Sequence, residues 1–392
     1  MHQLDFTPPA AKHGGSWGWI EKIHTTLERW MADPVVYRWA ISNPLTRWVA
    51  RRRTQQLYDL MGGFVHTQVL ISCVRLNVFA LLRASPMTVK DLAHRVEVPA
   101  ASLQRLVLSA IALGLLEHRS QGRVGLGPLG LPVATHEGVR AMVEHNHLLY
   151  LDLQDPVAFL RDAWRGDMAG YWPYAHGKES AAEMPQAQDA FSRYSALMDA
   201  SQNFVVGEIL STYNFSDHQC VLDVGAGKGR FISQLAQQER HLKIQLFDLA
   251  PVLQLAQVGL KAQGLLSRAS LHPGSFLSDP LPKGADLITL VRVAHDHSDA
   301  VVLQILRKAF EALPLGGTLL IAEPMAQEPG QPPLADAYFH YYLLAMGSGR
   351  LRTPTELMNL MAQSGLSHLE LLPNAMPIHA RVLIGRKSKC LP

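Results

Sequence analysis

The sequence predicts an α/β protein, in which a Rossmann-like, doubly wound domain follows a mostly helical domain of the winged-helix kind. Three features support this fold class. From about residue 201 onward, apolar strand patterns alternate with helical patterns. A glycine-rich turn ends the first of those strands, and a helix–helix–hairpin pattern precedes them. With 392 residues, of which 48% are hydrophobic, the chain is long enough to form two packed domains.

The bulk composition excludes several classes of protein. A formal net charge of +3 is too small to indicate nucleic-acid binding on its own. The cysteines Cys73, Cys220 and Cys390 are far apart, so they predict neither a metal site nor a disulfide framework and fit a reducing compartment. The N-terminal stretch MHQLDFTPPAAKHGG contains no apolar signal core.

The longest apolar stretch covers residues 60–82 and is interrupted by polar side chains, including Arg75 and Asn77. A membrane-spanning helix needs about 20 mostly apolar residues, and a buried arginine within it would be costly. We therefore expect one or two core helices here, in a protein that is soluble or peripheral to a membrane.

Residues 1–55 predict a separate helical extension that is basic and aromatic. It contains five tryptophans and the cluster RWVARRR at residues 47–53. Such a segment could touch an anionic membrane surface. Alternatively, it is a solvated helix whose tryptophans dock on the rest of the protein. The sequence leaves both interpretations open.

Residues 56–190 predict the winged-helix domain, whose pattern is clearest within residues 87–127. Thr88 is expected to cap a helix that turns Leu92 inward. A second helix follows and ends at Gly114. The next stretch, LLEHRSQGRVGLG, predicts two strands joined by a glycine turn.

The second helix of this pattern separates two functions of a winged helix. A DNA reader exposes Arg, Lys, Asn or Gln toward base edges. Here SLQRLVLSAIALGLL offers Gln104 and Arg105 and is otherwise almost entirely apolar. A helix that is apolar on nearly all sides is buried, often against a partner subunit. We therefore expect a dimerisation module without nucleic-acid binding, with a transcriptional regulator as the weaker alternative.

Residues 191–392 predict a parallel sheet with helices on both faces, because near-continuous apolar runs are joined by helical patterns. The expected strands are residues 219–225, 244–250, 285–293 and 317–325, followed by two final strands within residues 368–387. The expected connecting helices are residues 232–238, 252–264 and 299–313.

The turn after the first of these strands reads VLDVGAGKGR. In doubly wound folds, ligands bind at the carboxyl ends of the strands near the topological switch point. Gly225 and Gly227 remove Cβ atoms where a ligand would approach the backbone. The G-x-G-x-G spacing differs from the G-x-G-x-x-G of dinucleotide sites, because Arg230 stands where the last glycine would be.

Two acids narrow the ligand class. Asp248 ends the second strand about 20 residues beyond the turn, where a carboxylate can accept both ribose hydroxyls. Asp223, inside the turn motif, would repel a pyrophosphate but suits a cation such as a sulfonium group. Together the two acids favour S-adenosyl-L-methionine over NAD. A tight strand-to-helix turn without a ligand is the remaining alternative.

A cluster of histidines and acids lies at the carboxyl end of the strand expected at residues 285–293. Methyl transfer to a hydroxyl requires a base for the acceptor proton, and we expect His295 to be that base. Glu323, at the end of the next strand, is the candidate for orienting its ring, and Asp296 completes the predicted catalytic set. His297 is expected to be a surface or capping residue. We expect no metal site, because adjacent residues rarely converge on one ion.

The stretches VLDVGAGKG, FDLAPV, HPGSFLSDPLP, VRVAHDHSD and IAEPM resemble, in this order, those of the plant-type and acetylserotonin-type O-methyltransferases. The resemblance covers roughly residues 56–390. It implies a class I S-adenosyl-L-methionine methyltransferase domain behind a winged-helix dimerisation domain, and hence a homodimer.

The resemblance also implies which residues bind the cofactor. Gly225 and Gly227 would lie against its methionine part, and Asp248 would bind the ribose. Phe276 would lie near the adenine, and Arg292 takes the place of a cofactor-contacting lysine. The full expected set is Asp223, Gly225, Gly227, Asp248, Leu249, Ser275, Phe276 and Arg292.

His295 matches the catalytic histidine of the family, and Glu323 matches the acid that orients it. Two positions depart from the family pattern. Ser275 stands where the family often has an acid, so the adenine contact is expected to be weaker or to come from Asp279. His297 stands where the plant-type enzymes have a tryptophan.

Further stretches, MGGFVHTQVLISCVRL, LDLQDPVAFLR, YWPYAHG and DAYFHYYLLAMGSGRLRTPTEL, resemble bacterial enzymes that methylate the tertiary 1-hydroxyl of acyclic carotenoids. This implies an acyclic hydroxycarotenoid as substrate, S-adenosyl-L-homocysteine as the second product, and no metal. It also implies a cytoplasmic enzyme that is peripheral to the photosynthetic inner membrane. The alternatives are a C-20 methyltransferase of bacteriochlorophyllide and a phenolic O-methyltransferase.

A long apolar substrate requires a deep apolar tunnel. The residues expected to line it are Tyr194, Met198, Tyr338, Tyr342 and Met346, with Phe339, Tyr341 and Leu344 beside them. By helix geometry, roughly half of the aromatic and apolar residues at 338–346 would instead fill the domain core.

Overall fold

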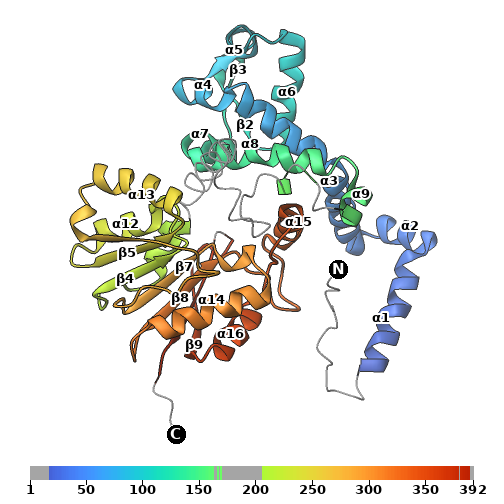
Figure 1. Ribbon diagram of the computed structural model, residues 1–392. Helices are drawn as coiled ribbons and strands as arrows, with labels where there is room; N and C mark the ends of the chain where they lie inside the picture. The colour runs from blue at the N-terminus through green and yellow to red at the C-terminus, as the bar shows by residue number, and fades with distance from the viewer. Residues whose placement is uncertain (1–16, 163–165, 167, 170–204, 379, 389–392) are drawn as a thin grey trace. The chain divides into compact units, whose positions relative to one another are not determined.

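The computed structural model describes residues 17–162, 166, 168–169, 205–378 and 380–388 (Figure 1). The chain forms two compact units, Met1–Ser72 and Cys73–Pro392. The described part of the first unit is helical, whereas the second unit contains both sheets.

The first unit is a succession of helices: α1 (Trp17–Ala32), α2 (Pro34–Ser42) and most of α3 (Pro44–Arg75). Asp33 begins α2, because its side chain accepts the N–H of Val35 and a proline suits the first helical position. Asn43 begins α3 in the same way, with its side chain accepting the N–H of Leu45. Capping residues therefore restart the helix twice.

Helix α3 carries the first part of the apolar stretch at residues 60–82. Leu60, Met61 and Phe64 are 77%, 65% and 73% exposed, so the prediction of core helices is wrong for this part. Burial begins farther along, at Val69 and Ile71. In the part of the chain that the structure describes, α3 is also the one helix long and apolar enough to cross a membrane, judged by length and composition alone.

The second unit begins with the winged-helix pattern that the sequence predicts. Its elements are α4 (Val78–Ala84), β1 (Met87–Thr88), α5 (Val89–Val96), α6 (Ala100–Ala112), β2 (Leu116–His118) and β3 (Arg123–Leu126). The three strands pair in the order β1-β3-β2. Thr88 caps α5 by accepting the N–H of Asp91, and Leu92 is fully buried, as expected. The helices α7 (Gly130–Thr135), α8 (Glu137–Asp152) and α9 (Pro156–Asp162) follow.

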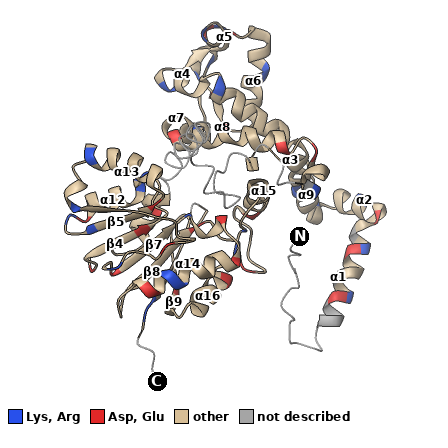
Figure 2. Ribbon diagram, in the orientation of Figure 1, with Lys and Arg blue, Asp and Glu red and all other residues tan. Residues whose placement is uncertain are grey.

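Helix α6 is the position at which a DNA-binding winged helix would expose polar side chains. Its only charged residue is Arg105 (Figure 2). Leu103, Val107 and Ala110 are buried, whereas Leu108 is half exposed. The distribution of charge on α6 therefore agrees with the prediction that this helix does not read base edges.

The large sheet has the order β6-β5-β4-β7-β8-β10-β9. Its strands are β4 (Cys220–Val224), β5 (Lys243–Asp248), β6 (Ala269–Pro273), β7 (Leu287–Val291), β8 (Thr318–Glu323), β9 (Ser367–Leu372) and β10 (Arg381–Arg386). The strands from β6 to β8 are parallel, and β10 runs antiparallel to both β8 and β9. The doubly wound domain predicted from the sequence is therefore confirmed, with β6 as a strand that the periodicity did not single out.

Helices cover both faces of this sheet and create two apolar cores (Figure 1). One core contains residues of α12 (Arg230–Gln238) and α13 (Ala250–Ala262). The other contains residues of α14 (Asp299–Ala312) and α16 (Pro354–Gln363). Strand β4 contributes Val221 to the first core and Leu222 to the second, because successive side chains point to opposite faces.

The strand order defines where a ligand is expected. The chain leaves β4 toward β5 on one side and returns to β7 on the other, so the topological switch point lies at β4 and β7. The carboxyl ends of β4, β5, β7 and β8 meet at the same edge of the sheet. Helix α15 (Asp336–Met346) follows the segment that leaves this edge from β8.

Candidate active site

The glycine turn after β4 adopts a backbone that only glycine accepts easily. Gly225, Gly227 and Gly229 have φ values of 71°, 56° and 74°. A Cβ atom on Gly225 would lie 2.8 Å from a methyl group of Val293, whereas one on Gly227 would enter open space. Gly227 is thus a place where the backbone is accessible and where any side chain would fill that space.

Asp248 lies beside this turn at the end of β5. Its carboxylate accepts the N–H of Gly227 at 2.8 Å and the N–H of Leu249 at 2.7 Å. Burial raises the pKa of Asp248 to about 6, and these two hydrogen bonds oppose the rise. The predicted ribose-binding acid and the glycine turn are therefore brought together.

Asp223 is buried within β4. The hydroxyl of Thr289 on β7 donates to its carboxylate at 2.7 Å. Burial raises the pKa of Asp223 to about 7, the Thr289 hydrogen bond opposes the rise, and the charge of Asp248 adds to it. Asp223 thus links two neighbouring strands, and its predicted place beside a cation stays a prediction.

The loop after β6 contains Ser275 and Phe276. The half-buried Phe276 ring would lie 3.8 Å from a Cβ atom on Gly225, and therefore close to the glycine turn. Asp279 accepts the N–H of Ser275 at 2.8 Å. This carboxylate oxygen is therefore engaged by the backbone of its own loop, and the predicted contact of Asp279 with adenine stays a prediction. The Ser275 hydroxyl accepts the N–H of Leu277 at 3.3 Å.

His297 packs edge-to-face against Phe276, with ring centroids 5.3 Å apart. Burial, and then the charges of His295 and Arg352, lower the pKa of His297 to about 4. The His297 side chain is therefore partly buried, and of the two predicted roles, surface or capping, the capping role is the one found. Its backbone N–H does close the preceding turn by donating to Ala294, as a capping residue would.

His295 lies in the 3-10 turn Ala294–Asp296 that follows β7. One oxygen of Glu323 accepts the backbone N–H of His295 at 2.9 Å and lies 3.2 Å from its Nδ1 atom. On the other side of the ring, Nε2 lies 3.3 Å from Asp296 Oδ1. The three side chains are buried together, with exposed fractions of 4%, 1% and 6% for His295, Glu323 and Asp296.

This arrangement suits one tautomer of the His295 ring. Because Glu323 stands beside Nδ1 as an acceptor, the proton of a neutral ring belongs on Nδ1, which leaves Nε2 as the basic atom. Burial raises the pKa of Asp296, while the charges of His295 and Arg292 oppose the rise. The three predicted catalytic residues are thus in contact at the carboxyl edge of the sheet.

Arg292 follows β7 directly and has a φ of 58°, which is unusual for a residue with a side chain. Its backbone N–H donates to Ala322 of β8 at 2.8 Å. Its charge acts on Asp296, on Tyr338 and on His145, whose pKa is lowered to about 4 by burial first and by Arg292 second. Arg292 therefore lies among the polar groups of this edge.

Helix α15 places the expected tunnel residues in an apolar cluster. Tyr342 and Met346 are 4% and 2% exposed, and Tyr338 packs against the same cluster. Tyr341 and Leu344 are 40% and 41% exposed, so they are not among the buried residues of this cluster, and their place beside a tunnel stays a prediction. The other two predicted lining residues, Tyr194 and Met198, lie outside the described residues.

Two residues of α8 in this cluster were missed by sequence reasoning. The Tyr338 hydroxyl donates to Asn146 at 2.9 Å, and the Tyr342 hydroxyl shares a hydrogen bond of 3.1 Å with His145 Nε2. A signal existed in the sequence, because the His-Asn pair interrupts an otherwise amphipathic helix, but nothing local identifies its partners almost 200 residues away.

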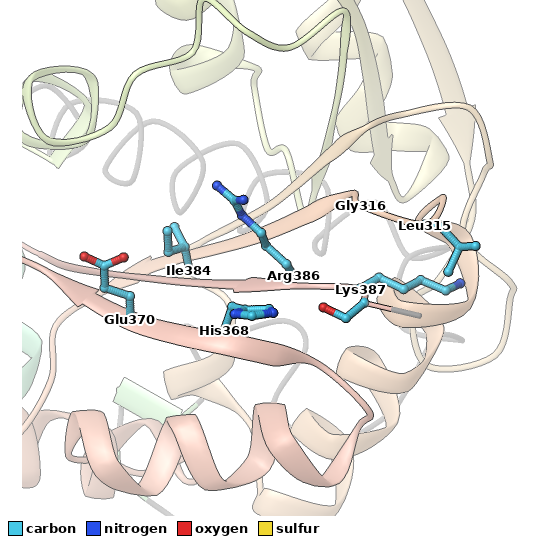
Figure 3. A pocket seen from close by; sticks show the side chains of 8 residues that line it. Leu315, Gly316, His368, Glu370, Ile384, Arg386 and Lys387 are labelled. Carbon is cyan, nitrogen blue, oxygen red and sulfur yellow. The ribbon is translucent and has the colours of Figure 1, made fainter. Parts of the chain in front are cut away.

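A surface hollow on the large sheet lies away from these residues. Figure 3 shows its lining, which includes Leu315, Gly316, His368, Glu370, Ile384, Arg386 and Lys387. In the pairing of β10 with β8, Arg386 is opposite Thr318 whereas Arg381 is opposite Glu323. The hollow is therefore near the amino end of β8, opposite the edge that carries the predicted site. Among the described residues, no group of three or more His, Cys, Asp or Glu could hold a metal ion.

Comparison with known proteins defines the class. Residues 150–367 match the O-methyltransferase domain, and residues 58–130 match the O-methyltransferase dimerisation domain. The chain belongs to this O-methyltransferase family and is an enzyme, which sets aside the regulator alternative.

Two curated relatives carry the same name. The demethylspheroidene O-methyltransferase of Cereibacter sphaeroides is 37% identical over 89% of this chain and 91% of the relative. That of Rhodobacter capsulatus is 39% identical over 83% of this chain and 80% of the relative. The structure of human N-acetylserotonin methyltransferase in complex with SAM has a TM-score of 0.72, with 22% identity, over 86% of this chain and 98% of that one. This last likeness shows the shared fold.

Proposed function

We propose that this enzyme transfers the methyl group of S-adenosyl-L-methionine to the tertiary 1-hydroxyl of an acyclic carotenoid, with His295 as the base. The observation that carries the substrate class is the identity of 37% and 39%, over most of the chain, to two demethylspheroidene O-methyltransferases. The buried contact of His295 with Glu323 at the carboxyl edge supports the catalytic assignment.

The residues around the glycine turn fit this cofactor. Gly227 leaves open space beside the backbone, and the partly buried Asp248 places its carboxylate next to it, where it could accept ribose hydroxyls. The half-buried Phe276 ring, close to Gly225, provides an apolar surface for a flat base. When bound, the cofactor supplies an electrophilic methyl group on a sulfonium.

The side chains at the end of β7 would manage the acceptor proton. A tertiary alcohol is a weak acid, so its oxygen needs a base as the new bond forms. With its Nδ1 proton directed at Glu323, His295 would receive the hydroxyl proton on Nε2, and Glu323 would stabilise the resulting positive ring. The side chains of His295, Glu323 and Asp296 are all buried. Their burial excludes water and so strengthens the electrostatic interactions among them.

The apolar cluster of α8 and α15 would receive the carotenoid chain. Tyr338, Tyr342 and Met346 combine apolar surface with two hydroxyls that are already engaged by Asn146 and His145. Since the polar groups of the cluster have partners, its surface toward an apolar ligand is effectively apolar. Tyr194 and Met198 stay predicted lining residues.

The enzyme is expected to act as a homodimer, which the match of residues 58–130 to a dimerisation domain supports. The exposed Leu60, Met61 and Phe64 lie within this match, and a second copy of the chain is the partner that would cover them.

The helices before the dimerisation match would contact a membrane surface. On α1, α2 and the start of α3, Trp30, Trp39 and Trp48 are 52%, 50% and 63% exposed. Arg38 and residues 51–53, which are all arginine, are also exposed on α2 and α3. Exposed tryptophans together with arginines are typical of helices that lie at an anionic bilayer, where an apolar substrate resides.

Vesicle flotation tests this membrane contact. The full-length protein should float with vesicles that contain phosphatidylglycerol at low salt, and much less with pure phosphatidylcholine. Replacing residues 51–53 by glutamine should reduce flotation while leaving turnover of a detergent-dissolved carotenoid unchanged. Equal binding to both vesicles, or loss of the dimer in this variant by light scattering, would contradict the proposal.

An acceptor assay tests the reaction itself. Methyl-labelled S-adenosyl-L-methionine would be offered with a 1-hydroxylated acyclic carotenoid, a chlorin without its meso methyl group, or a simple catechol. We expect label only in the carotenoid, as a methyl ether. Label in the chlorin or catechol alone would contradict the proposed substrate while leaving the family assignment intact.

A further inference from the structure

We propose that Arg352 and Gly349 form a positioning element for His295. They act through the main chain of the turn Ala294–Asp296, the catalytic turn. The proposal rests on the proposed role of His295 as base. In this proposal, the segment between α15 and α16 holds the main chain around His295, which neither the glycine turn nor Glu323 does alone.

Arg352 is 1% exposed and is one of the largest fully buried side chains among the described residues. Its guanidinium donates to the carbonyl of Ala294 at 2.8 Å and to the carbonyl of His297 at 2.6 Å. These two carbonyls belong to the first residue of the turn Ala294–Asp296 and to the residue directly after it, so they lie on either side of His295 and Asp296 in the chain. The planar fork of an arginine suits such a pair of acceptors, whereas a lysine would provide a single point of contact.

Gly349 closes against the same turn from its own side. It has a φ of 77°, and a Cβ atom on it would lie 2.0 Å from the carbonyl oxygen of His295. The next residue, Arg350, donates its backbone N–H to that carbonyl at 3.0 Å. Glycine is therefore required here because the segment and the catalytic turn are in direct main-chain contact.

The segment that holds the turn is itself fixed. Arg352 also donates to Asp299, the first residue of α14, and its carbonyl accepts the N–H of Ala326 at 2.8 Å. Thr353 and Glu356 form a reciprocal capping box that begins α16 directly after Arg352. Besides the catalytic turn, Arg352 is thus tied to α14 and to the segment that follows β8, and α16 begins directly after it.

The charge on Arg352 is compensated at Asp299. Burial alone would raise the pKa of Asp299, but hydrogen bonds from Arg350 and Arg352 lower it below its ordinary value. The carboxylate therefore stays ionised beside the buried guanidinium. Loss of the guanidinium would leave the Ala294 and His297 carbonyls without this donor and free the turn to shift.

His295 is consequently held from two directions. Glu323 of β8 contacts its ring and its backbone N–H, and the 349–352 segment contacts its carbonyl and those of the residues around it. Because the reacting atoms must be aligned within a fraction of an ångström, a small displacement of the turn would lower the rate of transfer more than the binding of either substrate.

The chain offers a matched control in Arg350. Its guanidinium pairs with Asp299 and Glu356. Among the described residues, it donates no hydrogen bond to a carbonyl of the turn. Arg350→Gln therefore removes ion pairs from the same network and leaves the main-chain contacts of Arg352 and Gly349 in place. It separates positioning of the turn from general support by the network.

The test compares Arg352→Met, Arg352→Lys, Gly349→Ala, Arg350→Gln and His295→Ala in the full-length enzyme. Turnover would be measured with a 1-hydroxylated acyclic carotenoid, and cofactor binding by calorimetry with S-adenosyl-L-homocysteine. We expect kcat to fall by about 10- to 100-fold in Arg352→Met and Gly349→Ala, with Kd changed by less than about 3-fold. Arg352→Lys should recover part of the loss, and Arg350→Gln should keep kcat within about 2-fold of the parent.

Three outcomes would overturn the proposal. The first is full kcat in Gly349→Ala, which removes no hydrogen-bonding side chain and therefore stays informative where Arg352→Met does not fold. The second is an equal loss in Arg350→Gln. The third is full turnover in His295→Ala, which would remove the base on which the proposal rests. Loss of activity in His295→Ala with full activity in the Arg352 and Gly349 variants would instead leave the proposed function standing and overturn the positioning role alone.

Discussion

The glycine turn after β4 and the histidine turn after β7 lie at the same edge of the sheet, yet they are built in opposite ways. The first is shaped by glycines with positive φ and leaves its backbone accessible at Gly227. The second buries its side chains and is held by Glu323 and Arg352. The contrast teaches that a site for a ligand needs space, whereas a group that reacts needs constraint.

The electrostatics of the two turns differ in the same sense. Around the glycine turn, burial raises the pKa of Asp248 to about 6 and of Asp223 to about 7. Around the histidine turn, the positive charges of Arg292 and Arg352 act on Asp296 and His297. We therefore expect substitutions at the first turn to change binding and pH dependence, and substitutions at the second to change turnover.

The largest effect is expected at the histidine turn. His295→Ala should lower kcat by about 10²- to 10⁴-fold, because the acceptor proton loses its base. The Kd of S-adenosyl-L-homocysteine, measured by calorimetry, should stay near that of the parent. His241→Ala is the matched control, since His241 is exposed before the amino end of β5. A similar loss in both variants would contradict the role of His295 as the base.

A smaller loss of turnover is expected when the partner of His295 changes. Glu323→Gln keeps an oxygen that can accept the His295 N–H but removes the charge that stabilises the protonated ring. We expect kcat to fall by about 10- to 100-fold, measured under saturating cofactor and acceptor. An unchanged kcat would show that His295 does not depend on this carboxylate.

At the glycine turn, Asp248→Asn should weaken cofactor binding with little change in kcat. Loss of charged hydrogen bonds of about 1.5–3 kcal/mol corresponds to roughly 10- to 100-fold in Kd. Because the pKa of Asp248 is about 6, parent Kd should rise as the pH falls through 6, and this dependence should vanish in the variant. Asp217→Asn, at an exposed position, is the control. A pH-independent parent Kd between pH 5 and 8 would contradict this prediction.

The last prediction concerns stability and leaves turnover aside. The folded-state pKa of Asp223, about 7, lies above its ordinary value of 3.8, so folded protein keeps a proton that unfolded protein has released. The contribution of the Asp223 side chain to the free energy of unfolding is fully present below about pH 4 and is lost as the pH rises through about 7. Asp223→Asn should therefore stabilise the ligand-free protein at pH 8 by about 2.5 kcal/mol more than at pH 5, because roughly 1.5 kcal/mol of the total difference is already present at pH 5. Thermal unfolding at both pH values measures this, and an equal effect at both would contradict it.

The glycine turn and the ends of the strands could be predicted from sequence because their causes are local. A positive φ favours glycine, and a buried parallel strand requires a continuous apolar run. The sequence alone therefore predicts both Gly225 and strand β4. The approach of Glu323 to His295 was also predictable, because adjacent parallel strands end at one edge.

The remainder could not be predicted because it depends on contacts between distant residues. Leu60 and Phe64 are as apolar as core residues, and their sequence does not say that no part of the described chain covers them. An arginine in a loop, such as Arg352, is usually expected to be solvent-exposed. Here it is buried and donates hydrogen bonds to carbonyls of a turn more than 50 residues away in the sequence. The packing of the His297 ring could not be predicted for the same reason, since its partner Phe276 lies in another loop.

A double-mutant cycle between His295 and Glu323, measured as kcat with a 1-hydroxylated acyclic carotenoid, tests directly whether the carboxylate acts through the histidine. If Glu323 acts through the His295 ring, Glu323→Gln should lower kcat in the parent but have almost no further effect in His295→Ala. Losses that multiply, as if the two residues acted independently, would contradict the account of the histidine turn as a base held by its neighbours.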